Sequence, residues 1–226
     1  MIQVRELSLE CGEAFLDALS LDVANGEIFF LLNRLGQDSD LLFRVLSGFQ
    51  KPAAGRILFD GRSQGEGPGA AFIDRVADVA DFDTEARVGD WIDFLCATGL
   101  NRENIYKTLL VCNFHERHLK KRFRELGPEI FNQVYLAACL APDHGNIVIN
   151  DFIRGAEKGF ELKFNRLLLQ QKAQGRAILC LGGDIIYASE IADRVGFVKN
   201  GHLLFDADAA ELKDMDIKGL YLKLLN

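Results

Sequence analysis

The segment from residue 33 to residue 40 has the position of an anion-binding loop but not the side chains of one. It follows an apolar run, Ile28–Leu32, and precedes a helical pattern, Leu41–Leu46. A glycine-rich loop in this context holds phosphate with backbone N–H groups and a lysine. Here the loop carries two carboxylates, and the first lysine of the chain is Lys51. A charge about 4 Å from another contributes roughly 4 kcal/mol at an effective dielectric of about 20, so these carboxylates oppose anion binding.

Two other places bring polar groups to the end of an apolar pattern. The β-branched run Asn146–Ile149 ends in the polar pair Asn150 and Asp151. Residues 127–129, Gly-Pro-Glu, begin a helical pattern in which Glu129 would satisfy the helix dipole itself and repel phosphate.

Histidine and cysteine do not form a recognisable metal site, and we expect no bound metal. His115 and His118 are three residues apart, whereas the zinc-protease helix spaces its histidines by four, so we expect a solvated helix face. The cysteines are scattered and never spaced as C-x-x-C, which favours reduced core thiols: Cys11, Cys96, Cys112, Cys139 and Cys180.

Composition excludes several classes of protein. The 226 residues are 49% hydrophobic and 26% charged, which describes a folded domain and neither a disordered chain nor a disulfide scaffold. The net charge of −7 disfavours nucleic acid as a partner. No apolar stretch approaches the roughly 18 residues of a membrane span, and no signal peptide is evident. We expect a cytoplasmic protein, peripheral to a membrane only through a partner.

The apolar patterns predict strands that alternate with helices, and therefore an α/β fold with a mainly parallel sheet covered on both faces. Helical patterns from Val88 to about Phe123 and from Glu129 to Ala141 predict a helical subdomain at about 88–140, inserted in a single domain of residues 1–226. Two short helices are expected after Phe205. The main predicted strands are Ile2–Leu9, Leu16–Val23, Ile28–Leu32, Arg56–Gly61, Ala70–Ile73, Asn146–Ile149, Ala177–Leu181, Val195–Val198 and His202–Phe205.

The order of these elements resembles the ATP-binding subunit of ABC transporters over essentially the whole chain. The resemblance implies a P-loop NTPase-like core of ABC type with an N-terminal antiparallel β-subdomain and a helical subdomain. The framework stretches that carry it are Asn25-Gly26-Glu27-Ile28, Leu46-Ser47-Gly48 with Pro52 and Gly55, Ile57–Gly61, Leu140-Ala141, Ile191–Val195 and Asn200-Gly201-His202.

The resemblance also assigns positions to the family's nucleotide motifs, and all of these motifs are substituted. Ser39 stands for the phosphate-loop lysine and Asp40 for the metal-binding hydroxyl, in the loop Asn33, Arg34, Leu35, Gly36, Gln37, Asp38, Ser39, Asp40. The signature L-S-G-G-Q reads Leu126, Gly127, Pro128, Glu129, Ile130. Asn150 stands at the Walker B aspartate and Asp151 at the catalytic glutamate. A slip of one residue would instead give Asp151 the metal role and leave Phe152 at the base position.

Other residues that the family uses are missing in either register. There is no glutamine near residues 74–78, where the family has one between its subdomains, and Gly183 stands at the switch histidine. In the family an aromatic side chain stacks on adenine at the position of Cys11, and this chain has no aromatic residue there. Phe15 could substitute, although we expect it to pack in the core. Glu157 keeps a carboxylate at the aspartate that crosses the family's dimer interface.

The leading hypothesis is a degenerate ABC-type ATP-binding subunit that does not hydrolyse ATP and has a structural or regulatory role in a transporter-like membrane complex. A working ATPase that uses Arg34, Asp151 or a residue of a partner in substitute roles is one alternative, and a nucleotide-independent assembly module is another. We expect no cofactor, and at most weak binding of Mg-ATP. The resemblance implies a permease subunit, a second ATP-binding subunit, or both as partners, in a homodimer or a heterodimer.

Overall fold

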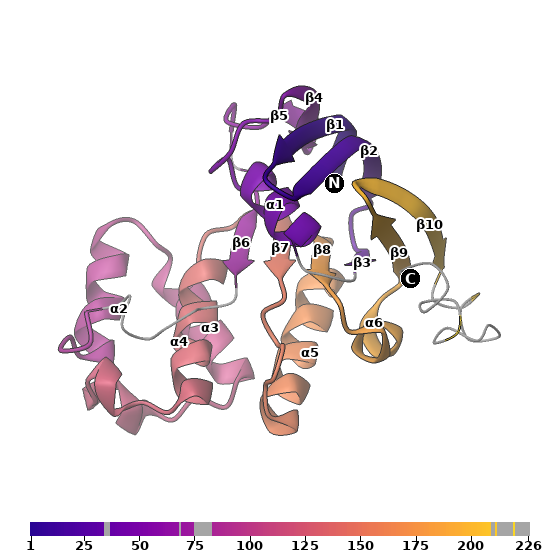
Figure 1. The fold of residues 1–226 in the computed structure, drawn as a ribbon. Helices are drawn as coiled ribbons and strands as arrows, with labels where there is room; N and C mark the ends of the chain where they lie inside the picture. Colours follow the sequence, from indigo (N-terminus) through magenta and orange to yellow (C-terminus); the bar gives the residue numbers. More distant parts are fainter. Residues whose placement is uncertain (34–36, 68, 75–82, 209–210, 212–218, 220–226) are drawn as a thin grey trace. The chain divides into compact units, whose positions relative to one another are not determined.

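The computed structural model describes residues 1–33, 37–67, 69–74, 83–208, 211 and 219 (Figure 1). It contains two compact units. The first comprises residues 1–74, 144–151 and 171–226, and the second comprises residues 75–143 and 152–170. Each unit has its own apolar core.

A mixed sheet forms the centre of the first unit, in the order β10-β9-β3-β8-β7-β6. All neighbouring pairs are parallel except β9 and β10, which form an antiparallel hairpin. Every residue of β3, β7 and β8 is buried, as expected for parallel strands covered on both faces. The strands are β3 (Ile28–Leu32), β6 (Ala71–Asp74), β7 (Asn146–Asn150), β8 (Ala177–Gly182), β9 (Arg194–Lys199) and β10 (His202–Asp208).

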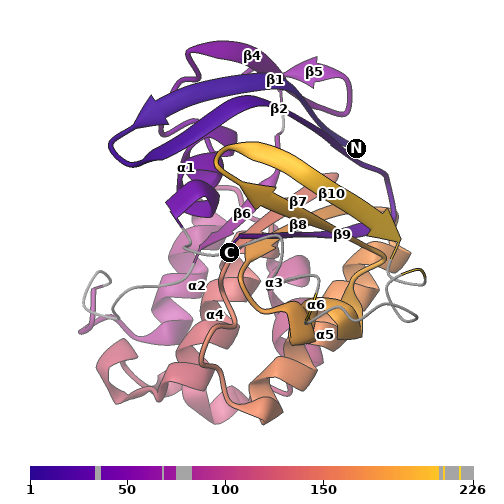
Figure 2. The ribbon, with the colours of Figure 1, turned by 45° about the vertical axis from the view of Figure 1, so that its right-hand side comes forward.

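An antiparallel sheet of order β2-β1-β4-β5 forms a second layer of this unit (Figure 2). The predicted parallel core and N-terminal antiparallel subdomain are therefore confirmed. A double irregularity interrupts the β1–β2 pairing, where Glu6 and Ala18 have φ of 47° and 49°. Their N–H groups donate to the hydroxyls of Ser20 and Ser8 at 2.8 and 2.9 Å. The strands are β1 (Ile2–Cys11), β2 (Ala14–Val23), β4 (Ala54–Phe59) and β5 (Arg62–Ser63).

Helix α1 (Gln37–Leu46) packs its apolar face into the core shared by the two sheets. Its C-terminal end is closed by Gly48, which has a φ of 81°. The Gln64 Nε2 group donates to the carbonyls of Val45 and Leu46 at 2.8 and 2.6 Å, which satisfies carbonyls that the last helical turn leaves open. The same unit contains the short helix α6 (Ile185–Ile191).

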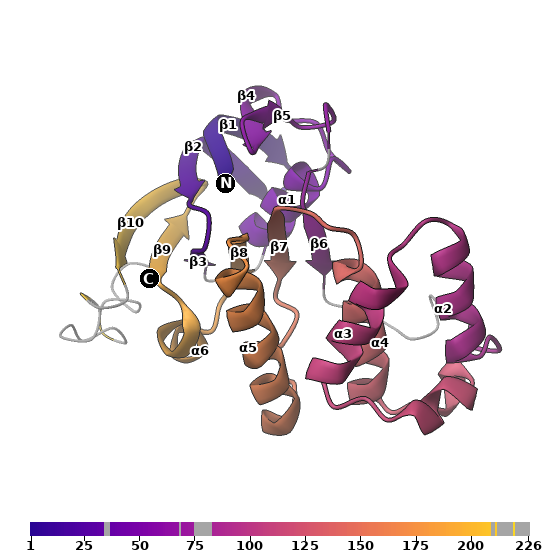
Figure 3. The same ribbon diagram turned by 180° about the vertical axis from the view of Figure 1, so that it is seen from behind.

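The second unit is helical (Figure 3). Its core is built on Phe123, whose ring packs edge to face against Trp91 and Phe131 with centroids 5.4 and 6.0 Å apart. The helices are α2 (Val88–Ala97), α3 (Arg102–Val111), α4 (Pro128–Leu140) and α5 (Lys158–Ala173), with 3-10 turns at Glu116–Lys120 and Phe123–Glu125. The last residues of α5 belong to the first unit.

Two expectations about single side chains change. His118 is 7% exposed and its ring lies 5.6 Å from that of Phe114, so the predicted solvated face is wrong for this histidine. Burial, with Lys121 and Arg117 nearby, lowers the pKa of His118. Phe15 is 37% exposed rather than packed in the core, because it alternates with the inward residues of β2.

The cysteines are core residues only in part. Cys112 and Cys180 are buried, whereas Cys11, Cys96 and Cys139 are intermediate. No helix of the described residues is long and apolar enough to cross a membrane. The two helices expected at the C-terminal end fall on residues that are mostly outside those described.

Candidate functional site

The loop between β3 and α1 begins in the buried interior of the first unit. Asn33 follows β3 directly, is 4% exposed, and donates its backbone N–H to the Gly182 carbonyl at 3.1 Å. Ser39, in the first turn of α1, is 5% exposed. Arg34 and Gly36, which were predicted to belong to this loop, lie outside the described residues.

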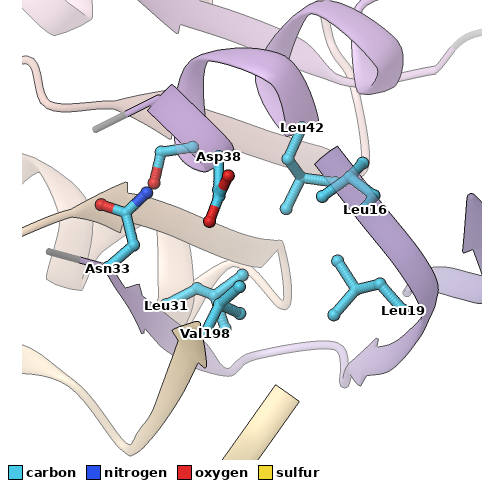
Figure 4. Close-up of a pocket in the computed structure, with 8 residues that line it drawn as sticks. Leu16, Leu19, Leu31, Asn33, Asp38, Leu42 and Val198 are labelled. Carbon is cyan, nitrogen blue, oxygen red and sulfur yellow. The ribbon is translucent and has the colours of Figure 1, made fainter. Parts of the chain in front are cut away.

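The Asp38 carboxylate has hydrogen-bond partners within the protein. It accepts hydrogen bonds from the backbone N–H groups of Phe15 and Gly201. Burial raises the pKa of Asp38, and the two hydrogen bonds partly oppose this shift. Beside it lies a cavity of about 10 Å³, enough for about one water molecule. Leucine side chains and Val198 lie opposite Asn33 and Asp38 in this cavity (Figure 4).

The turn between β9 and β10 fixes one of the two donors to Asp38. Gly201 has a φ of 70°, and its carbonyl accepts the backbone N–H of Asp17 at 3.2 Å. A Cβ at this glycine would lie 2.7 Å from the Phe15 carbonyl oxygen, so only glycine allows this close approach to β2. His202 adds an exposed contact, with Nε2 3.3 Å from Asp17 Oδ2.

A second group of polar side chains lies at the carboxyl end of the parallel strands. Asn150 ends β7, Asp74 ends β6, and Asp40 comes from the first turn of α1. The Asn150 Nδ2 group donates to Asp40 Oδ1 at 2.8 Å and to Asp74 Oδ1 at 2.9 Å. We call these three side chains the amide bridge. Ligands of open α/β sheets bind at this edge, so the amide bridge occupies the place where a ligand is expected.

Of the positions predicted for a catalytic base and a switch residue, only that of Asp151 carries an ionisable side chain. Asp151 has a φ of 45° and donates its backbone N–H to the Leu181 carbonyl at 2.8 Å. Its Oδ1 lies close to Gly182 at the end of β8. Gly183 has no side chain, and the following Asp184 caps α6 by accepting the N–H groups of Ile186 and Tyr187.

The predicted signature segment belongs to the second unit. Pro128 opens α4, and its N-cap, Gly127, has no side chain with which to cap the helix. Glu129 forms an ion pair with Lys163 of α5 and accepts a hydrogen bond from Gln133 Nε2 at 3.2 Å. A negative charge already compensated within the unit therefore lies in the first turn of this helix.

The one-residue slip does not supply a base, because Phe152 is 6% exposed and stacks on Tyr135 with centroids 6.0 Å apart. Glu157 is exposed, and its carbonyl accepts the N–H of Phe160 at the start of α5.

The described side chains do not fit Mg-ATP. The Asp38 carboxylate is bonded to two backbone N–H groups, and Asp40 is bonded to Asn150. Both would face a bound triphosphate with like charge, and no lysine precedes Lys51 to offset it. Within the described part of the chain there is also no group of three or more His, Cys, Asp or Glu residues arranged to hold a metal ion.

Sequence reasoning located Asp38, Asp40 and Asn150 but missed three of their partners. Asp74 was considered only as the first residue of the range 74–78, where the family has a glutamine and this chain has none. The backbone donors at Phe15 and Gly201 carry no sequence signal of their own, except that an Asn-Gly turn at residues 200–201 favours a tight hairpin.

Comparison with solved structures identifies the class of fold. An ATP-binding subunit of an ABC transporter matches with a TM-score of 0.82 over 100% of both chains at 18% identity. A nucleotide-free ATP-binding cassette matches with a TM-score of 0.78 over 98% of both chains at 18% identity. A dimeric cassette of a bacterial ABC transporter matches with a TM-score of 0.75 over 92% of this chain and 99% of that one, at 15% identity. The chain has the fold of an ABC transporter ATP-binding cassette, as predicted.

Sequence relatives are proteins of the same class, although no family model matches the chain. An ABC transporter ATP-binding protein of Methanosarcina acetivorans is 24% identical over 213 residues, which cover 90% of this chain and 34% of the relative. A Methanosarcina mazei protein with the same description is 23% identical over 97% of this chain and 40% of its own length. The chain thus spans well under half of these two relatives. YtrB of Bacillus subtilis, an ABC transporter ATP-binding protein, is 25% identical over 96% of this chain and 75% of its own length.

Proposed function

We propose that the chain is a degenerate ABC-type ATP-binding subunit that does not hydrolyse ATP and that has a structural or regulatory role in a transporter-like membrane complex. One observation carries the proposal. The carboxylates at the start of α1 are bonded within the protein, Asp38 to backbone N–H groups and Asp40 to Asn150.

A lysine near the β- and γ-phosphates contributes an attraction on the order of 4 kcal/mol at about 4 Å and a dielectric of about 20, and Ser39 cannot supply it. Asp38 and Asp40 add repulsive terms of the same order. Nucleotide would therefore have to displace existing hydrogen bonds and bind against a net unfavourable field.

If two cassettes associate head to tail, each nucleotide lies between the phosphate loop of one and the signature of the other. Pro128 removes a backbone donor from that signature, and Glu129 adds negative charge. This chain would then impair both composite sites, even beside an intact partner. A permease subunit, a second cassette, or both are the partners we propose, with the chain held at the membrane through them.

Calorimetric titration of the purified protein with ATP, with and without Mg²⁺, tests the proposal. We expect no binding up to millimolar nucleotide. A micromolar Kd, equivalent to about −8 kcal/mol, would overturn it, as would Mg-ATPase turnover at the rates of ordinary transporters.

A variant with four substitutions in the loop between β3 and α1 provides the matched control. Asn33→Gly, Asp38→Gly, Ser39→Lys and Asp40→Ser together restore the residue types of a phosphate loop. Nucleotide binding by this variant but not by the parent would show that these side chains cause the loss. Circular dichroism and urea unfolding establish that both proteins are folded.

A further inference from the structure

A 3-10 turn of the second unit and its C-cap carry three exposed cations that form no ion pair with any other described residue. These side chains, which we call the basic turn, are Arg117, Lys120 and Lys121. By contrast, Arg122 and Arg124 of the same segment both pair with Glu85. The protein therefore neutralises part of this basic run internally and leaves the basic turn available to a partner.

The geometry of the turn brings these charges together. Residues i and i+3 of a 3-10 helix eclipse, so Arg117 and Lys120 lie along the same edge of the turn. His118, between them in the chain, is buried. Burial lowers the pKa of His118, and so do Lys121 and Arg117, which therefore lie within electrostatic range of one ring. Like charges gathered in this way repel one another, and a neighbouring anionic surface would relieve that repulsion.

We propose that the basic turn is a contact surface for the anionic headgroups of a phospholipid membrane. Each lysine or arginine beside an anionic leaflet is attracted to it, and the long aliphatic stems let the charged ends reach the headgroups. An acidic polypeptide would have to present carboxylates at the particular spacing of these side chains. A leaflet presents anionic groups at every spacing, so it can meet all three exposed cations at once.

The net charge of −7 does not prevent this contact. The Debye length is about 8 Å at physiological ionic strength, so the leaflet interacts with the side chains nearest to it and more distant charges are screened. Within residues 115–121 three cations stand against one carboxylate, Glu116. The inference rests on the proposed function in one respect, that a membrane complex holds the chain. It adds a direct and weak contact between the helical unit and lipid, which strengthens an attachment made elsewhere.

The test is sedimentation of the full chain, without nucleotide, with phosphatidylcholine vesicles that do or do not contain phosphatidylserine. The bound fraction as a function of lipid concentration gives a partition coefficient. We expect binding only to the anionic vesicles. Each of Arg117→Gln, Lys120→Gln and Lys121→Gln should weaken it about fivefold, equivalent to about 1 kcal/mol per charge near a leaflet, and the triple variant about a hundredfold. Salt at about 1 M should abolish it.

Lys107→Gln is the matched control. Lys107 is an exposed lysine of the same helical unit, and its Nζ lies 2.8 Å from Glu103 Oε1, so this variant loses the same charge from a cation that already has a partner. It should leave the partition coefficient unchanged. Equal weakening by Lys107→Gln and Lys120→Gln would mean that net charge alone sets the binding and would overturn the proposal.

Glu116→Lys makes the opposite change, because it replaces the one carboxylate of the turn with a cation. Two charges separate it from the parent, so binding should strengthen about 25-fold. This gain keeps the test decisive where the parent binds weakly. Absence of binding at millimolar anionic lipid by both the parent and Glu116→Lys would overturn the proposal, as would equal binding to the two kinds of vesicle.

Two further measurements separate the alternatives. Retention of the parent, but not of the triple variant, on immobilised polyglutamate without binding to vesicles would assign the basic turn to an acidic protein partner and overturn the lipid contact. ATP binding together with binding to anionic vesicles would sink the proposed function and leave the lipid contact standing. Binding of neither would do the reverse.

Discussion

Substitution of Gly201 tests whether the β9–β10 turn positions the candidate site. In Gly201→Ala the new Cβ would lie 2.7 Å from the Phe15 carbonyl oxygen and 2.8 Å from the Asp17 backbone nitrogen. Both contacts are with backbone, so the turn must move away from β2. The φ of 70° adds the strain of a left-handed conformation, roughly 1–2 kcal/mol for a residue with a side chain.

The overlap itself should cost about 1–3 kcal/mol, the range for overpacking, so we expect a total loss of about 2–5 kcal/mol. At an m-value of about 2 kcal/mol per molar urea, the unfolding midpoint would fall by about 1–2.5 M. The assay is urea unfolding followed by circular dichroism. A displaced turn would also remove one donor from Asp38.

Gly61→Ala separates the two contributions. Gly61 has a φ of 78°, and a Cβ there meets no described atom within 4 Å. This control should therefore lose only about 1–2 kcal/mol, from backbone strain. Equal losses in the two variants would refute the reasoning, because they would show that the approach of Gly201 to Phe15 carries no energetic weight.

Three further predictions concern other residues. Because burial raises the folded-state pKa of Asp38 above its ordinary 3.8, the stability that this carboxyl contributes is present at acidic pH and lost as pH rises through the folded pKa. Asp38→Asn should therefore unfold at higher urea than the parent at pH 7 and lose that advantage below about pH 4, and a constant difference would count against this account. Burial raises the pKa of Cys112 to about 11 and of Cys180 to about 12, so these two buried thiols should react with a disulfide reagent at neutral pH only after unfolding. Phe123→Ala should lower the free energy of unfolding by about 3–5 kcal/mol, and a loss under 1 kcal/mol would show that the ring contacts of the helical core contribute little.

The central strands of the first unit were predictable because they have no polar face. The apolar runs at β3 and β8 bury every residue, and flanking turn residues limit their length. Single side chains at element edges were less predictable. Phe15 points outward because it alternates with the inward residues of β2, and the predicted strand Leu16–Val23 began one residue after it. His118 turns inward on a 3-10 helix, where the period of an α-helix does not predict the buried face.

Individual side chains at this place in the fold could be singled out from the sequence, but the hydrogen-bond network that joins them could not. Position along the chain and resemblance to a known loop singled out Asp38, Asp40 and Asn150. The bond between Asn150 and Asp74 depends on β6 and β7 being neighbours in the sheet, and one sequence does not encode strand order in a readable way. The local pattern predicts which residues are polar, whereas topology decides which of them meet.

Strand order also sets the sequence of events during synthesis. β3 is entirely apolar, and both of its neighbours, β8 and β9, are translated only after the residues of the helical unit. Until then β3 has unpaired edges, and long-range parallel pairing of this kind is slow. The nascent chain therefore exposes an aggregation-prone strand for most of its translation, and we expect its yield to depend strongly on chaperones that shield that strand.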